Sequence, residues 1–150
     1  MVTMDAKPLF IDTNILVYAS VKESPFQQQA LAALETAYNA NRSLWISRQI
    51  IREFLVVMTR PQAFDSLPKD AVLQQIEHFS KKFNVADDTN KETQQLVSLL
   101  KQFPCGGKQI HDMNIVASML ANGVSNLMTH NVKDFKRFES IIIVENLLNE

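Results

Sequence analysis

The sequence predicts a three-layer α/β/α fold with a central, mainly parallel sheet. Short apolar segments alternate with longer segments of helical periodicity, an order that is typical of successive β–α–β units. Two of the short segments, at 124–131 and 140–146, are apolar on consecutive residues, as in strands that are buried on both faces. We therefore expect helices on both sides of the sheet.

The first strand is expected at 8–12, because PLFID is apolar on successive positions and too short for a helix. The next element is a helix over 25–39, in which Ser24 and Gln27 match a capping box around a proline at the first helical position. The apolar residues that recur at helical spacing in it, and that we expect to face inward, are Phe26, Ala30, Leu34, Ala37 and Tyr38.

SLWIS at 43–47 is the second expected strand. Ser47 is a suitable N-cap for a helix over 48–60, which ends before Pro61 because a proline disfavours the helical conformation of the preceding residue.

The alternation continues to the end of the chain. Further helices are expected at 67–83, 90–103 and 108–123, and further strands at 83–87, 124–131 and 140–146. The residues expected to face inward are Val72, Leu73, Ile76 and Phe79 in the first of these helices and Ile115, Val116, Met119 and Leu120 in the third.

Size and composition indicate one globular domain over residues 1–150. The apolar fraction of 46% is too high for a disordered chain. The single cysteine, Cys105, excludes an internal disulfide and suits a reducing, cytoplasmic location. The chain has no apolar run long enough to span a membrane, and its start does not read as a signal peptide.

The net charge of −1 is too small for the whole protein to attract a polyanion. A nucleic-acid substrate would need a local basic patch or a bound cation. Basic residues that could supply such a patch are Lys108, Lys133, Lys136 and Arg137, and Arg48, Arg52 and Arg60, although for any one of them ordinary solvated charge is the better interpretation.

Acidic and amide side chains follow the expected strands. Asp12 ends the first strand, and Asn131 and Asp134 follow the strand that contains NLMT. Glu53 lies one turn into the helix after LWIS, and Asp112 opens the helix over 108–123. Because sites in parallel sheets form at the carboxyl ends of the strands, we expect these side chains to lie at one edge.

Carboxylates that share a pocket repel one another by on the order of 4 kcal/mol at 4 Å and an effective dielectric of 20. Either a shared proton or a cation removes that repulsion. Oxygen ligands, with no cysteine or paired histidine among them, favour a hard cation such as Mg²⁺ or Mn²⁺. The reaction that best suits such a site is metal-assisted hydrolysis of a phosphodiester.

Four segments, FIDTNIL, SRQIIREFLVVMTRP, GKQIHDMNIVASMLANG and LMTHNVKDFKRF, resemble in order the motifs of PIN-domain nucleases. The pattern is similar to the VapC-like toxin ribonucleases of bacterial toxin–antitoxin pairs and covers about Leu9 to Val144. The resemblance implies a Mg²⁺-dependent endoribonuclease that acts on RNA. It also implies a cognate antitoxin and a homodimer.

By this resemblance, Asp12, Glu53 and Asp112 occupy the three main acidic positions of the catalytic site and bind the metal. Many family members have an aspartate at the position of Asn131, so the fourth place is left to Asn131 as a ligand or to Asp134 as an additional acid. The residues expected to support the ligands are Thr13, Asn14 and Thr129.

Other interpretations remain open. Asp12 suits a turn, Asp112 suits a helix cap, and Glu53 could pair with a neighbouring arginine. His111 and His130 are expected to be spectators, although His130 could also touch a phosphate. The competing functions are a PIN-fold binding module with weakened catalysis, which Asn131 favours, and a phosphoaspartate phosphatase or receiver, against which the lack of a D-x-D motif at Asp12 counts.

Overall fold

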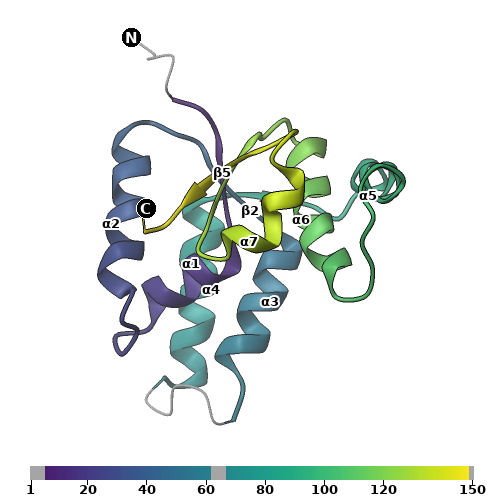
Figure 1. Ribbon diagram of the computed structural model, residues 1–150. Helices are drawn as coiled ribbons and strands as arrows, with labels where there is room; N and C mark the ends of the chain where they lie inside the picture. Colours follow the sequence, from purple (N-terminus) through teal and green to yellow (C-terminus); the bar gives the residue numbers. More distant parts are fainter. Residues whose placement is uncertain (1–5, 62–66, 149–150) are drawn as a thin grey trace.

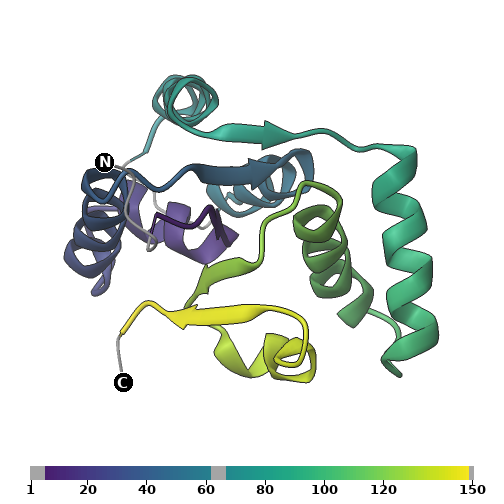
Figure 2. The ribbon, with the colours of Figure 1, turned by 90° about the horizontal axis from the view of Figure 1, so that it is seen from above.

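A computed structural model describes residues 6–61 and 67–148. Its centre is a sheet of five parallel strands in the order β3-β2-β1-β4-β5 (Figures 1 and 2). The strands are β1 at Leu9–Ile11, β2 at Leu44–Ser47, β3 at Asn84–Ala86, β4 at Asn126–Thr129 and β5 at Ile143–Asn146. The predicted parallel α/β architecture is therefore confirmed.

Helices cover both sides of this sheet, with α1 and α2 on one side and α5 and α6 on the other (Figure 2). The helices are α1 at Thr13–Ser20, α2 at Gln27–Asn39, α3 at Arg48–Met58, α4 at Lys69–Lys82, α5 at Asn90–Gln102, α6 at Gln109–Ala121 and α7 at Val132–Phe135, and a 3₁₀ turn follows at Lys136–Phe138. No helix in the described part of the chain combines the length and apolarity that a membrane span requires.

The order of the strands reverses beside β1. The chain moves outward from β1 to β2 and β3, and then returns to the other side of β1 with β4 and β5. Strands β1 and β4 are in register, with Ile11 opposite Met128, and the Asp12 amide donates to the Met128 carbonyl at 3.0 Å. The residues that follow β1 and β4 therefore start at the same level, which is where parallel sheets form their sites.

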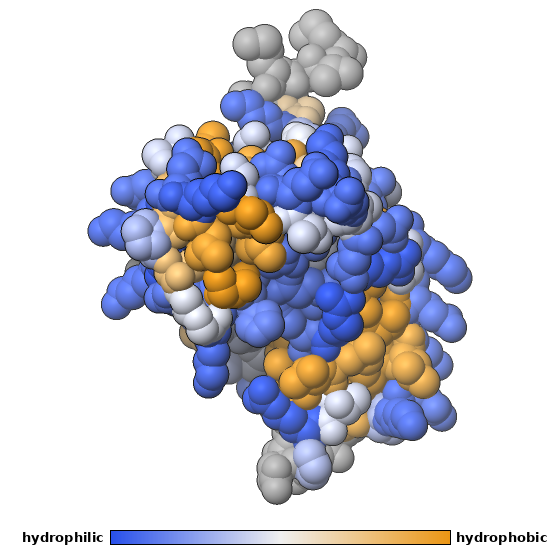
Figure 3. All heavy atoms as spheres, turned by 90° about the vertical axis from the view of Figure 1, so that its right-hand side faces the viewer, coloured by the Kyte–Doolittle hydropathy of each residue, from blue (hydrophilic) through white to orange (hydrophobic). Residues whose placement is uncertain are grey.

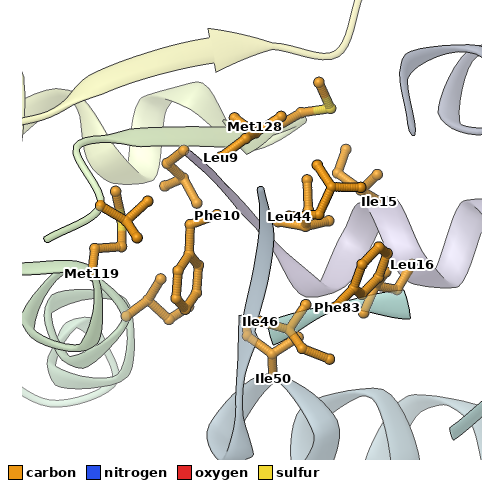
Figure 4. Close-up of a cluster of buried hydrophobic side chains, with 14 of the residues drawn as sticks. Leu9, Phe10, Ile15, Leu16, Leu44, Ile46, Ile50, Phe83, Met119 and Met128 are labelled. Atoms are coloured by element: carbon orange, nitrogen blue, oxygen red, sulfur yellow. The ribbon is translucent and has the colours of Figure 1, made fainter. Parts of the chain in front are cut away.

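The core is built on both faces of β1. Phe10 and Ile11 are fully buried, as a strand in the middle of a parallel sheet requires. Figure 4 shows Phe10 pointing toward Met119 of α6, while Ile15 and Leu16 of α1 lie on the opposite side near Leu44. This packing fixes both helices relative to the end of β1.

Two local predictions are wrong at the start of the chain. The sequence analysis assigned no helix to 13–20, but α1 begins directly after β1 because Asp12 caps it and accepts from the Thr13 amide at 2.8 Å. Ile15, Leu16 and Val17 are all buried, so α1 lacks the amphipathic period that reveals most helices. Ser24 accepts from the Phe26 amide, and no side chain caps α2, so the capping box does not form.

Other predictions concern burial. Ser47 caps α3 as predicted, accepting from the Ile50 amide at 3.2 Å. Tyr38 and Leu73, which were expected to face inward, are 59% and 48% exposed because they lie at the margins of their helical stripes. Ile143 is 50% exposed because β5 is an edge strand, so the expectation that 140–146 is buried on both faces is wrong. The segment after β4, for which no helix was predicted, contains α7.

An ion pair ties the edge strand β5 to the rest of the sheet. The guanidinium of Arg42 donates twice to the Glu145 carboxylate, at 2.9 and 2.7 Å, and once to the Lys7 carbonyl at 2.8 Å. Asn126 of β4 donates to the same carboxylate at 2.9 Å. The hydrogen bonds from Arg42 lower the pKa of Glu145 below its ordinary value.

We predict that Arg42→Met lowers the free energy of unfolding by about 1–3 kcal/mol near neutral pH, because the half-buried Glu145 loses its bidentate partner. Because the pKa of Glu145 is lowered in the folded protein, the ion pair stabilises the fold at pH values above the ordinary pKa of a glutamate. That stabilisation is lost as the pH falls through the pKa of Glu145 in the folded protein. Urea unfolding of both proteins at neutral and acidic pH measures it. Equal stabilities at neutral pH would contradict the prediction.

Candidate active site

One cavity lies at the carboxyl edge of the sheet. It has a volume of about 910 Å³ and receives side chains from the ends of β1 and β4 and from α3 and α6. Asp12, Glu53, Asp112 and Asn131 all line it, although they come from four distant segments of the chain. The structure thus brings together the residues that the sequence analysis singled out, apart from Asp134.

Asp12 is the most tightly held of these side chains, with 6% of its surface exposed. Thr129 donates to its Oδ2 at 2.7 Å, Asn14 donates to the same oxygen at 3.2 Å, and the Thr13 amide donates to Oδ1. Asn14 also links the two strand ends, since its Oδ1 accepts from the His130 amide at 3.2 Å. Each of the three residues predicted to support the ligands therefore contacts Asp12.

Glu53 is joined to the same network from α3. The Thr13 hydroxyl donates to its Oε1 at 3.3 Å, and Gln49, one turn earlier in α3, donates to its Oε2 at 3.2 Å. The neighbouring arginines have other partners, because Arg52 pairs with Asp88 and Arg48 with Asp87. The alternative in which Glu53 serves to neutralise a neighbouring arginine is therefore wrong.

The acids in the cavity affect one another electrostatically. The pKa of Asp12 is raised from 3.8 to about 6, first by burial and then by the charges of Glu53 and Asp134, against the lowering effect of its hydrogen bonds with Thr129 and Thr13. The pKa of Asp112 is also raised to about 6, first by burial and then by the charges of Asp134, Asp12 and Glu53. Arg137 partly offsets this rise. The cavity is therefore a place where negative charge is unfavourable.

The two candidates for the fourth position differ in placement. Asn131 lines the main cavity, and its backbone N–H donates to the Thr129 hydroxyl at 3.0 Å. Asp134 lies in an adjoining cavity of about 360 Å³, which Asn131 and His130 also line. Asp134 acts on Asp12 and Asp112 through its charge, whereas Asn131 supplies a polar side chain to the cavity itself.

The donor set is suitable for a hard cation, although it is not assembled as a cage. Within residues 6–61 and 67–148, no three His, Cys, Asp or Glu side chains are close enough together to hold one metal ion. The four predicted ligands in the cavity, Asp12, Glu53, Asp112 and Asn131, nonetheless supply oxygen atoms of the kind that Mg²⁺ and Mn²⁺ prefer, and two of the carboxyl groups have raised pKa values. A divalent cation would relieve this repulsion, and the carboxylates would have to draw together around it.

The histidines near the cavity have structural partners. The ring of His130 is 2.7 Å from the Tyr18 hydroxyl through Nδ1, and its centroid lies 4.6 Å from that of Phe26. His111 is exposed at the start of α6, and its backbone carbonyl accepts from Gln49 at 2.9 Å. These contacts account for the His130 ring without a phosphate, whereas His111 also lines the main cavity, so its role as a spectator stays a prediction.

Several further polar residues of the cavity were not predicted from the sequence, among them Gln49, Glu92 and Asn114. The sequence patterns around these residues indicate a role in the site only weakly. Glu92 lies in the first turn of α5, where an acid is ordinary because it favours the helix dipole. Gln49 is four residues before Glu53, a spacing that places the two side chains on one face of α3.

Apolar and basic side chains also line the cavity. Val56, Val57 and Leu96 line it together with Arg52 and Arg60. Figure 3 shows this side of the molecule, where hydrophilic side chains form a band between two apolar patches. The exposed apolar side chains of α3 and α5 are Val56 at 57%, Val97 at 50% and Leu100 at 45%.

Comparison with known proteins identifies relatives of similar length. A curated relative, ribonuclease VapC48 of Mycobacterium tuberculosis, is 24% identical over 135 residues, which cover 88% of this chain and 92% of the relative. The VapBC2 structure of Rickettsia felis, bound to a promoter DNA fragment, shares 25% identity at a TM-score of 0.66 and covers 92% of this chain and 97% of its own.

VapBC-1 of nontypeable Haemophilus influenzae, at 22% identity and a TM-score of 0.64, has the same fold over 93% of this chain and 98% of its own. The PIN domain family model matches residues 8–133, a span that runs from just before β1 to the start of α7 and contains Asp12, Glu53, Asp112 and Asn131. On that match, the chain belongs to the PIN-domain family.

Proposed function

We propose that the chain is a metal-dependent endoribonuclease that hydrolyses RNA phosphodiester bonds and acts as the toxin of a toxin–antitoxin pair. The observation that carries the proposal is the buried Asp12 carboxylate, which shares one cavity with Glu53 and Asp112 at the point where the strand order reverses. The names of the relatives, a ribonuclease VapC48 and VapBC proteins, support the same substrate and the same biological role.

The residues that would hold Mg²⁺ or Mn²⁺ are Asp12, Glu53 and Asp112, together with the amide oxygen of Asn131. When bound, the cation would neutralise the carboxylates, polarise the phosphodiester and make a nearby water a better nucleophile. Thr129, Asn14 and the Thr13 amide hold Asp12 in one orientation, so that little reorganisation is needed at that ligand. Glu53 completes the acidic group and orients the attacking water.

The remaining walls suit a nucleotide chain. Arg60 has no ion-pair partner among the described residues, so its guanidinium is available for an RNA phosphate. Val56, Val57 and Leu96 offer an apolar surface against which a base could lie. An endonuclease needs an open cavity, and contacts of this kind position a strand without selecting its sequence.

We further propose that the chain forms a homodimer, works in the cytoplasm and is held inactive by a cognate antitoxin. Neighbouring structures of the same fold include a toxin–antitoxin complex from Klebsiella pneumoniae, at 22% identity and a TM-score of 0.65. The apolar side chains exposed on α3 and α5 provide area that a partner could cover.

One feature favours a second candidate function, a PIN-fold binding module with weakened catalysis. The position after β4 carries Asn131, which brings no negative charge, and Asp134 lies outside the main cavity. Asn131 nevertheless retains an oxygen donor. Family membership gives no support to the phosphoaspartate alternative.

The first test is cleavage of a mixed-sequence RNA by the purified chain with Mg²⁺. We predict that Asp12→Asn lowers the cleavage rate at least roughly 100-fold, because it removes the charge of the most tightly held ligand. Loss of a residue that only supports a metal ligand typically lowers activity about 10–100-fold, so loss of the ligand's charge should cost at least as much. A matched control is Asp70→Asn on the exposed first turn of α4, which should cleave normally. Cleavage that is unchanged in Asp12→Asn, or insensitive to EDTA, would refute the assignment of this metal site. A wild-type chain that binds Mn²⁺ but does not cleave RNA would instead favour the binding module.

The raised pKa of Asp112 predicts a pH dependence of stability in the absence of metal. The pKa of Asp112 is about 6 in the folded protein, above the ordinary value of 3.8. Protonation of Asp112 therefore stabilises the folded protein below about pH 3.8, and this contribution is lost as the pH rises through about 6. Asp112→Asn is uncharged at every pH. Its Tm relative to the wild type should therefore increase between about pH 4 and pH 7 in EDTA.

Thermal unfolding with added Mg²⁺ completes this comparison. Near neutral pH the ion should raise the Tm of the wild type more than that of Asp112→Asn, because binding to the folded state stabilises it. A difference in Tm between the two proteins that stays constant with pH in EDTA would show that Asp112 does not carry an unfavourable charge.

A further inference from the structure

A chain of hydrogen bonds connects the buried Glu92 of α5 to Glu53 of α3. The Asn114 side-chain amide of α6 donates to Glu92 Oε1 at 3.0 Å and to Gln49 Oε1 at 2.7 Å. The Gln49 amide nitrogen donates in turn to Glu53 Oε2 at 3.2 Å and to the His111 carbonyl at 2.9 Å. We call Gln49 and Asn114 the amide bridge.

The directions of these hydrogen bonds depend on one another. Each amide nitrogen in the bridge has two hydrogens, and both hydrogens of each are used. The Glu92 Oε1 atom accepts, so Asn114 presents its nitrogen to it and not its oxygen. Asn114 then requires Gln49 to present its oxygen, which leaves the Gln49 nitrogen facing Glu53. Glu92 at one end of the bridge and the His111 carbonyl at the other thus both favour the orientation in which Glu53 meets a donor.

Stability alone does not account for Glu92. Only 6% of its surface is exposed, and its Oε2 has no hydrogen-bond partner in the described part of the chain. A buried carboxylate with one unsatisfied oxygen is costly, and an apolar residue would pack there without that cost. Glu92 also lines the same cavity as Asp12, Glu53 and Asp112, outside the four acidic or amide positions of the proposed metal site.

We propose that Glu92 is a positioning residue of the nuclease site, which acts through the amide bridge to hold the Glu53 carboxylate toward the cavity. The inference rests on the proposed function. It assigns to Glu92 the role of a hydrogen-bond acceptor, so the essential feature is its oxygen facing Asn114 and not its negative charge. It differs from a direct ligand role, in which the charge itself would be needed.

The test compares Glu92→Ala, Glu92→Gln and Asn114→Ala in the full chain. Glu92→Ala leaves Asn114 free to turn its amide, so we expect kcat for RNA to fall roughly 10-fold with little change in KM, and the Kd for Mn²⁺ alone, measured by calorimetry, to rise roughly 10-fold. Glu92→Gln keeps an acceptor oxygen and should stay within about 3-fold of the wild type in both measurements.

Asn114→Ala should match Glu92→Ala, and the double variant should be no worse than Asn114→Ala, because the two residues act in one chain. Glu77→Ala, at an exposed position of α4, is the matched control and should behave as the wild type. Should Glu92→Ala fail to fold in thermal unfolding, Glu92→Gln and Asn114→Ala provide the same contrast.

Two results would overturn the inference. One is wild-type kcat and Mn²⁺ affinity in both Glu92→Ala and Asn114→Ala. The other is a Glu92→Gln variant as impaired as Glu92→Ala, since that would assign the effect to charge. A wild-type chain that neither cleaves RNA nor binds Mn²⁺ would instead overturn the proposed function itself, together with the inference that depends on it.

Discussion

The structure depends on placing the Asp12 carboxylate, almost without solvent, at the end of the central strand. Burial disfavours its charge and raises its pKa to about 6, even though Thr129 and the Thr13 amide donate to it. The same carboxylate caps α1, so the fold cannot move it away from the cavity without losing the start of that helix. A structural cap and a candidate ligand are thus the same side chain.

The surroundings of Asp12 show how the fold tolerates this charge. Strand β4 provides Thr129 beside it, and α3 provides Glu53, whose oxygens are held by Thr13 and Gln49. Donors orient the carboxylates of Asp12 and Glu53, yet the raised pKa values of Asp12 and Asp112 show that negative charge in the cavity is not fully compensated. Such an arrangement favours a bound divalent cation over an apo state, which is why the proposed nuclease site and the electrostatics of the fold lead to the same residues.

Much of this could be predicted from the sequence, because strands that are apolar on consecutive residues and helices with clear caps identify themselves. The convergence of Asp12, Glu53 and Asp112 followed from one topological rule about parallel sheets. Helix α1 could not be predicted in the same way, since its buried Ile15, Leu16 and Val17 read as easily as a strand. The role of Glu92 was hidden because its partners, Gln49 and Asn114, become neighbours only in three dimensions.

The central claim is that Asp12, Glu53 and Asp112 form one centre for a divalent cation. A crystal structure of the chain grown with Mn²⁺, with anomalous diffraction data that locate the ion, tests it most directly. We expect an anomalous peak coordinated by oxygens of these three side chains, with the carboxylates drawn together relative to the metal-free arrangement. A peak bound elsewhere, or no peak at this cavity at saturating Mn²⁺, would contradict it.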